Sequence, residues 1–209
     1  MKLRILSLAA GMLAAICPLQ AQNQDPLDRL MSASRQGRLE FDYSFSSGLN
    51  TKMTGRGHAI VQGDCFLVRG NGLEIYCDGH SASSIDRESR EVIIESIDGE
   101  DSGNYLNPAT LISYVDKHFR RKSCTKSNYA GLPALKYILE PTRETGISRI
   151  NLIISADGRK LYSASVSTRD AGSTDFDISN FRIMDAGGLS DFVLDCSSLG
   201  PSYIITDLR

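Results

Sequence analysis

Cysteines are the residues of this 209-residue chain best suited to covalent chemistry, and there are five of them. One lies near the N-terminus, and the other four are Cys65, Cys77, Cys124 and Cys196. In an exported chain an even number of cysteines is typical of disulfides, with three possible connectivities for four. If Gly70-Asn71-Gly72 forms a three-residue hairpin loop, Cys65 and Cys77 face each other across two strands, where a bridge is geometrically possible. A Cys124–Cys196 bridge would then follow by elimination, and the lack of a Cys-x-x-Cys motif disfavours a redox-active pair.

Other chemistry-bearing residues do not assemble into a catalytic pattern. The sequence contains no Gly-x-Ser-x-Gly motif and no cysteine with an obvious histidine partner. Asp78 and His80 could share one side of a strand end, but two ligands at a turn fall short of a metal site. Asp98 and Asp101 lie in an acidic, glycine-bearing segment, where solvation explains them. We therefore expect no enzyme activity, no metal and no cofactor.

One basic cluster stands out, formed by Lys117, Arg120, Arg121, Lys122 and Lys126. Such a cluster could meet lipid headgroups or a partner protein. The favoured interpretation is a charged edge strand, because lysine and arginine discourage edge-to-edge pairing. Acidic residues outnumber basic ones, 25 to 23, so the overall charge does not point to a nucleic-acid partner.

The N-terminus has the pattern of a signal peptide. Lys2 and Arg4 precede an apolar run over residues 5–16 that is too short to span a bilayer, and Leu19-Gln20-Ala21 is an acceptable cleavage site. Cys17 raises the alternative of a lipid-modified N-terminus, but a lipobox requires a small residue where Ile16 stands. We expect cleavage after Ala21, which leaves residues 22–209 as one domain, and the sequence contains no second apolar stretch long enough to cross a membrane.

The elements that must position these residues are mostly strands. Residues 57–95 contain three short apolar runs, at 66–68, 73–76 and 92–94, joined by glycine-bearing turns. With the three-residue loop, Leu67, Leu73 and Ile75 fall on one face, and Phe66, Val68 and Tyr76 on the other. Apolar residues on both faces predict apolar cover on both sides of this piece of sheet.

The rest of the chain extends this sheet and adds two helices. Asp25-Pro26 and Asn107-Pro108 each combine an N-cap with proline at the first helical position. Residues 39–45 alternate apolar and polar, and five strands are expected over 118–183, with short edge strands at 192–194 and 203–205. The fold class is therefore α+β, a single large, strongly curled antiparallel sheet with two helices.

The order of these signals resembles the outer-membrane lipoprotein carrier family, LolA, in its Bacteroidetes-type members, over nearly the whole of residues 22–209. The motifs that carry the resemblance are Gly57-His58-Ala59-Ile60, Gly63-Asp64-Cys65-Phe66, Glu74 to Gly79, Arg90 to Ile94, Asn107-Pro108, Asp157-Gly158, Asp170 to Thr174, Ile178 to Phe181, Asp191 to Asp195 and Ile204 to Arg209. The resemblance implies an open half-barrel whose concave side is covered by helices acting as a lid.

By this resemblance the protein is a monomeric carrier of the periplasm. It would bind the acyl chains of lipoproteins, or another lipid, in an apolar cavity, with an inner-membrane release complex and an outer-membrane acceptor as partners. The residues expected to line the cavity are Phe66, Leu67, Val68, Ile75, Tyr76, Ile93, Leu111, Val115, Ile138, Leu152 and Ile154. The alternative is a non-enzymatic sensor or accessory module of the cell envelope, with the same fold, that binds a lipid or a partner protein.

Overall fold

A computed structural model of the protein describes residues 24–48, 52–97, 108–169 and 172–209, apart from the side chains of Thr110, Ser113, Tyr114 and Asp116. The expected signal peptide at 1–21, the acidic residues Asp98 and Asp101 and the Asn107 N-cap lie outside the described residues.

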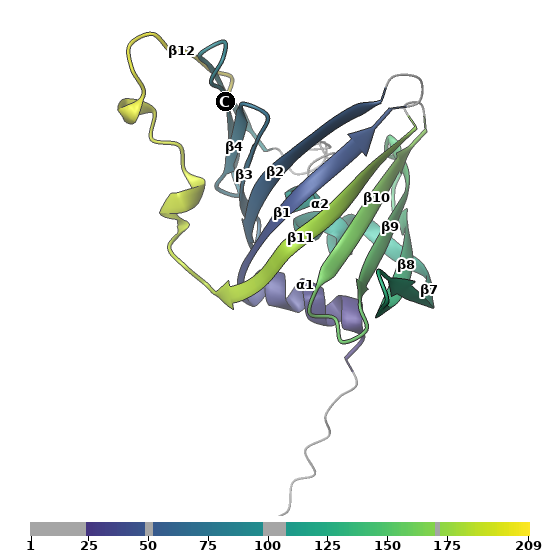
Figure 1. Cartoon of the computed structure of the whole chain (residues 1–209). Coiled ribbons are helices and arrows are strands. Elements are labelled where there is room, and N and C mark those ends of the chain that lie inside the picture. The colour runs from purple at the N-terminus through teal and green to yellow at the C-terminus, as the bar shows by residue number, and fades with distance from the viewer. Residues whose placement is uncertain (1–23, 49–51, 98–107, 170–171) are drawn as a thin grey trace, which may run out of the picture.

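The described residues form two helices and one sheet of twelve strands (Figure 1). The helices are α1 (Pro26–Gln36) and α2 (Pro108–His118). The strands are β1 (Gly37–Ser47), β2 (Met53–Gln62), β3 (Cys65–Gly70), β4 (Leu73–Cys77), β5 (Ser81–Asp86), β6 (Glu91–Ser96), β7 (Phe119–Tyr129), β8 (Leu132–Pro141), β9 (Ile147–Ser155), β10 (Leu161–Thr168), β11 (Ser173–Asp185) and β12 (Ile204–Asp207). Their order is β12-β6-β5-β4-β3-β2-β1-β11-β10-β9-β8-β7, so the sheet is open, with β12 and β7 at its two ends. The predicted single antiparallel sheet is confirmed except at one end: β12 alone among the strands described here pairs in parallel, with β6.

Both helices pack on the same face of the sheet, which we call the helix face (Figure 1). The Asp25 side chain accepts a hydrogen bond from the Leu27 amide at 2.9 Å, and Pro26 opens α1, as predicted. In α1, Leu27, Leu30 and Met31 are buried against the sheet. The apolar side of α2, including Leu111 and Val115, joins the same core.

Strand β1 shows why the helix face is apolar. Leu39, Phe41 and Tyr43 are buried on that face, and Glu40 and Asp42 alternate with them on the opposite one. This two-residue period matches the pleat of a strand with one solvated side, as the sequence predicted.

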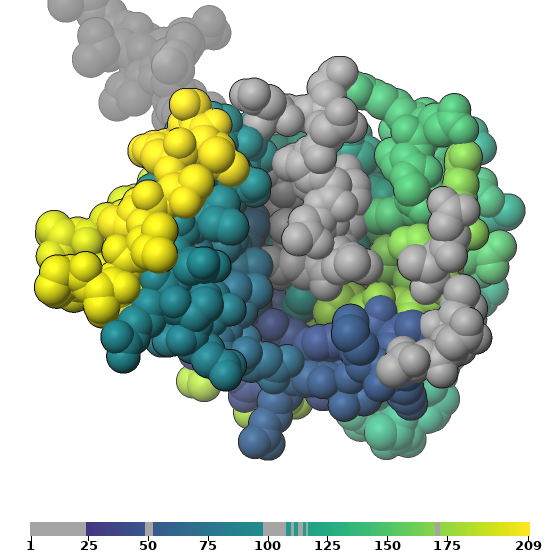
Figure 2. Space-filling view, turned by 90° about the horizontal axis from the view of Figure 1, so that it is seen from above, coloured from purple at the N-terminus to yellow at the C-terminus, as the bar shows by residue number. Residues whose placement is uncertain are grey.

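The neighbouring strands β3 and β4 have apolar cover on both faces, also as predicted, but the second cover is not a helix. It is the segment 186–209, which we call the C-terminal strap. Its Phe192 is 1% exposed and packs against Cys65 and Leu67, on the face opposite the helices. Figure 2 shows the strap, in yellow, against teal strands of the first half of the chain, on the side of the molecule away from most of the green strands.

Two residues near the chain's first strands fix the start of the strap. The Arg38 guanidinium forms an ion pair with Asp191 at 2.7 Å, donates to the Gly188 carbonyl at 2.9 Å and lies over the Phe192 ring. The Gln62 side chain donates to the Gly187 carbonyl and accepts from the Gly187 amide.

The predicted hairpin between β3 and β4 was wrong by one residue. The loop is the two-residue turn Asn71-Gly72, and both residues have positive φ, +52° and +81°, as a type I′ turn requires. Cys77 therefore faces Phe66, not Cys65. A one-residue change of register turns one strand over relative to the other, so Ile75 shares the helix face with Val68.

The predicted disulfides are corrected by the same observations. Cys65 packs on the strap side and Cys77 in the core of the helix face, so their side chains point to opposite faces. Cys124 lies in β7 and Cys196 packs beside β6, at the two ends of the sheet. All four are free thiols.

The tail also differs from the expectation in detail. Residues 189–192 form a short 3₁₀ helix, η1 (Leu189–Phe192), in place of the expected edge strand at 192–194. A second one, η2 (Cys196–Ser198), precedes β12, which adds the last strand of the sheet close to where it was predicted. None of the helices in the described part of the chain is long and apolar enough to cross a membrane.

Candidate ligand cavity

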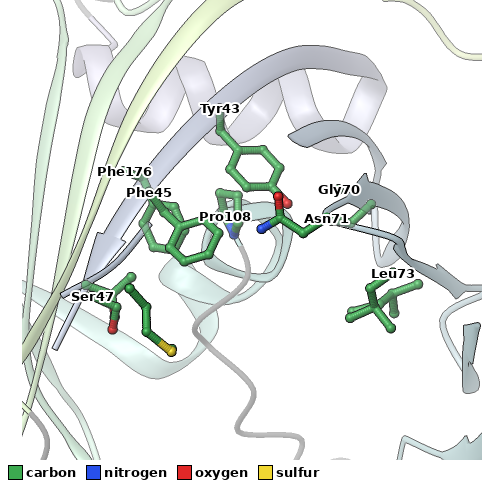
Figure 3. A pocket seen from close by; sticks show the side chains of 12 residues that line it. Tyr43, Phe45, Ser47, Gly70, Asn71, Leu73, Pro108 and Phe176 are labelled. Carbon is green, nitrogen blue, oxygen red and sulfur yellow. The ribbon is translucent and has the colours of Figure 1, made fainter. Parts of the chain in front are cut away.

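The helix face contains a hollow of about 370 Å³ (Figure 3). Strands β1 to β4 and β11 and the first residue of α2 supply its walls. The lining residues are Tyr43, Phe45, Ser47, Met53, Val68, Gly70, Asn71, Leu73, Ile75, Pro108, Thr174 and Phe176. This volume falls within the range of about 300–1,000 Å³ that small-molecule sites occupy in proteins.

Glycines create the space for this hollow. Tyr43 is paired with Gly57 and Phe45 with Gly55 across β1 and β2, and Gly57 is paired with Gly70 across β2 and β3. A Cβ added at Gly57 would lie 2.5 Å from the Tyr43 hydroxyl, and one at Gly55 would lie 2.5 Å from the Phe45 ring. The two aromatic rings therefore lie directly on the β2 backbone, which leaves open volume above them.

Apolar side chains at the hollow remain unusually exposed for residues on a core face. Met53 is 63% exposed and Leu73 42% exposed, and both line the hollow. Ile93 is 42% exposed and lies on the same face, because Ile75 pairs with Ser84 and Ser84 pairs with Ile93 across neighbouring strands. A contiguous set of apolar side chains that the fold leaves partly uncovered is typical of a binding surface.

The polar groups in the lining are few and neutral. The Ser47 and Thr174 hydroxyls are 2.7 Å apart and share a hydrogen bond. Asn71 contributes a carboxamide whose nitrogen lies over Gly55, and Tyr43 contributes a phenol. Burial raises the pKa of the Tyr43 phenol, so the group stays a neutral donor. None of the lining residues named above carries a charge, and the hollow is thus suited to an apolar, uncharged ligand.

The predicted cavity residues are distributed over both faces of the sheet. Val68 and Ile75 line the hollow. Others lie on the helix face without lining it, namely Phe66, Leu111, Val115, Leu152 and Ile154 in the core and Ile93 at the exposed margin. Leu67 and Tyr76 face the strap, and Ile138, which alternates with buried Tyr137 and Leu139, points away from the helices. The structure thus brings part of the predicted set together around one hollow.

Sequence reasoning missed the aromatic wall of the hollow. Tyr43 and Phe45 were predicted to lie on the apolar face of their strand, and that alternation marked the right face. The further signal was Gly55 and Gly57 on the next strand, directly opposite the two aromatic residues once the strands are paired. Glycines opposite aromatic residues allow the rings to lie on the neighbouring backbone.

The other chemistry-bearing residues have structural partners. Asp78 accepts hydrogen bonds from the His80 and Ser81 amides at 2.8 and 2.7 Å, an arrangement that caps a turn. His58 Nδ1 donates to the Asp42 carboxylate at 2.8 Å, and its Nε2 lies 3.5 Å from a Glu40 carboxylate oxygen, on the face opposite the helices. Among the described residues no group of three or more His, Cys, Asp or Glu side chains could hold a metal ion.

The basic cluster lies at the end of the sheet, as the edge-strand interpretation predicted, since β7 is the last strand. Most of its members pair with carboxylates, among them Arg121 with Asp25 at 2.9 Å and Lys122 with Glu140 at 2.5 Å. Lys117, at the end of α2, pairs with Asp64 at 2.6 Å.

Comparison with known proteins gives a likeness of fold. No protein-family model matches the sequence, and no curated protein is similar to it. Among solved structures, an uncharacterized conserved protein from Thermus thermophilus superposes with a TM-score of 0.57 at 8% identity, over 88% of this chain and 98% of that one. The likeness is in the fold alone.

The structural neighbours also include members of the family that the sequence resembles. A LolA superfamily protein from Nitrosomonas europaea has a TM-score of 0.45 at 11% identity, over 82% of this chain and 97% of that one. An outer membrane lipoprotein-sorting protein domain from Vibrio parahaemolyticus, described as putative, has a TM-score of 0.43 at 10% identity, over 79% and 94%.

Proposed function

We propose that this protein is an exported, non-enzymatic carrier that holds the acyl chains of lipoproteins, or of another lipid, in the hollow on the helix face. The observation that carries the proposal is the hollow itself, about 370 Å³ in volume, walled by apolar side chains and free of charge among its lining residues. The class of cargo comes from the resemblance of the sequence motifs to the LolA family.

The energetics suit such a ligand. Each methylene moved from water into an apolar site contributes about 0.8 kcal/mol, so about ten methylenes contribute on the order of 8 kcal/mol before the cost of association. A lipid-modified protein needs this protection to cross an aqueous compartment. The partly exposed side chains of Met53, Leu73 and Ile93 supply apolar surface on which a longer or second chain would continue beyond the hollow.

In this proposal the open sheet acts as a half-barrel and the helices as its lid. The lid would move on the sheet to admit the chain, with α2 beside the hollow as the moving part, since Pro108 at its start contributes to the lining. The protein would work as a monomer in the periplasm after removal of residues 1–21. It would receive cargo from an inner-membrane release complex and pass it to an outer-membrane acceptor.

A pair of matched substitutions tests the binding site. The side chains of Ile75 and Ile138 are both half-buried on strands, but Ile75 lines the hollow and Ile138 faces away from the helices. N-phenyl-1-naphthylamine is a neutral probe that fluoresces in apolar sites, and the chain has no tryptophan to interfere.

We expect the wild type and Ile138→Glu to bind this probe and Ile75→Glu to lose binding at least tenfold, because a carboxylate in the hollow must be desolvated. Equal binding by folded Ile75→Glu and Ile138→Glu variants would contradict the site. Absence of binding by the wild type would contradict the function.

A further inference from the structure

The Tyr43 side chain has a feature that packing alone does not explain. The residue is 8% exposed, and it lines the hollow. Its phenol has no hydrogen-bond partner anywhere in the part of the chain that the structure describes, and burial is the one influence on its pKa. Among the described residues no fully buried side-chain oxygen or nitrogen lacks a hydrogen-bond partner, so the unpaired Tyr43 hydroxyl is open to the hollow that it lines, where a ligand can accept its hydrogen bond.

The position of this hydroxyl is fixed by the backbone of β2. The site that a Cβ would occupy at Gly57 is 2.5 Å from the hydroxyl oxygen and 2.7 Å from the ring carbon that bears it. The phenol therefore lies on the strand and does not extend across the hollow. Figure 3 shows the hydroxyl end of the Tyr43 ring pointing toward Asn71 and away from the Phe45 and Phe176 rings.

The absence of charge in the lining restricts the ligand that could satisfy this donor. An ionised carboxylate brought into the hollow would lose its hydration without gaining a cation from any of the twelve lining residues. A neutral carbonyl oxygen accepts a hydrogen bond from a phenol at a much smaller desolvation cost. Ester- and amide-linked acyl chains carry such a carbonyl at the end of the apolar chain.

We propose that Tyr43 selects the ligand by donating a hydrogen bond to the carbonyl of an ester- or amide-linked acyl chain, and that the hollow discriminates against free fatty-acid anions. This inference rests on the proposed function, because it assumes that an acyl chain occupies the hollow. Gly57 is the positioning residue, since it lets the phenol lie where the carbonyl can reach it.

The test compares two lipids that differ at this carbonyl. 1-Monolauroylglycerol has an ester carbonyl, and 1-O-dodecylglycerol has the same chain length with an ether in its place. Each is titrated, as monomers, against wild-type protein loaded with N-phenyl-1-naphthylamine, and laurate at pH 8 is the anionic comparison. Tyr43→Phe removes only the hydroxyl. Tyr162→Phe is the matched control, because its ring stacks on Tyr129 away from the hollow.

For the wild type and Tyr162→Phe we expect the ester to displace the probe at roughly three- to tenfold lower concentration than the ether. One net hydrogen bond changes a binding constant by about that factor. Laurate should be weaker than the ester. Tyr43→Phe should bind both neutral lipids with equal affinity. A wild-type ester-to-ether ratio of one, or a ratio that Tyr43→Phe leaves intact, would overturn the role of Tyr43 while leaving acyl-chain binding in place. Failure of both neutral lipids to displace the probe from the wild type would instead overturn the proposed function, and this inference with it.

Discussion

The glycine at position 57 offers a sharp test of how the hollow is built. A methyl group there would lie 2.5 Å from the Tyr43 hydroxyl and 2.5 Å from the Arg69 carbonyl oxygen, whereas carbon atoms in good contact are about 3.5–4.0 Å apart. In Gly57→Ala the tyrosine ring must therefore recede by about 1 Å, and the open volume lies on its free side. The Arg69 carbonyl belongs to the paired strand and can move only with the backbone.

We expect Gly57→Ala to lower the free energy of unfolding by about 1–3 kcal/mol, the usual cost of overpacking. It should also weaken binding of N-phenyl-1-naphthylamine, because the displaced ring takes up part of the hollow. Urea unfolding followed by circular dichroism gives the first quantity, and fluorescence titration gives the second.

The matched control for this experiment is Gly146→Ala, since a Cβ at Gly146 meets nothing within 4 Å. That variant should be as stable as the wild type or slightly more stable, because alanine restricts the unfolded chain. If Gly57→Ala matches Gly146→Ala in both stability and probe binding, the argument that glycine makes room for the aromatic wall is wrong.

Three further predictions concern the rest of the molecule. Phe192→Ala should raise the rate of hydrogen exchange in residues 186–209 and leave probe binding at the hollow unchanged, because Phe192 anchors the strap on the face opposite the hollow. Loss of probe binding would contradict the placement of the strap and the hollow on opposite faces of the sheet. Native alkylation at pH 8 should label exposed Cys124 well before Cys77, because burial raises the pKa of the Cys77 thiol to about 11. All four thiols should react in the denatured protein, and a protein mass two units below that of the fully reduced chain would instead reveal a disulfide. The hydrogen bond from Arg87 lowers the pKa of Glu74. Ionised Glu74 therefore stabilises the fold at pH values above the ordinary carboxyl pKa of about 4.3, and this stabilisation is lost as the pH falls through the lowered pKa of the folded state. Glu74→Gln should therefore be less stable than the wild type at pH 7 and equal to it at the lowest pH at which both fold, and a difference independent of pH would contradict this account.

Local sequence signals predicted the elements well because their causes are local. Pro26 and Pro108 open the two helices, and the alternation from Leu39 to Phe45 defines the strand and its apolar face. The basic residues of β7 marked an end of the sheet, because charge protects an unpaired edge.

The register of the β3–β4 hairpin could not be settled in this way. Gly70-Asn71-Gly72 is compatible with a two- or a three-residue loop, and the choice decides which face every β4 side chain takes. The incorrect loop length placed Cys77 opposite Cys65 and placed Ile75 on the same face as Leu67.

The strap and the hollow depend on contacts between distant parts of the chain. Phe192 begins a short apolar run that predicted an edge strand, and its place under Arg38 becomes visible only once the sheet is assembled. The hollow likewise arises where Gly55 and Gly57 meet aromatic residues of another strand, and neither strand alone shows it.

The central claim, that the hollow on the helix face holds acyl chains in the cell, is tested most directly by native mass spectrometry of the protein isolated gently from its own compartment. The account predicts a population heavier than the polypeptide by an acylated lipoprotein or lipid, released by detergent and reduced in the Ile75→Glu variant. Bound mass that Ile75→Glu leaves unchanged, or a clean mass of the polypeptide alone, would contradict it and would favour a sensor or accessory role for the same fold.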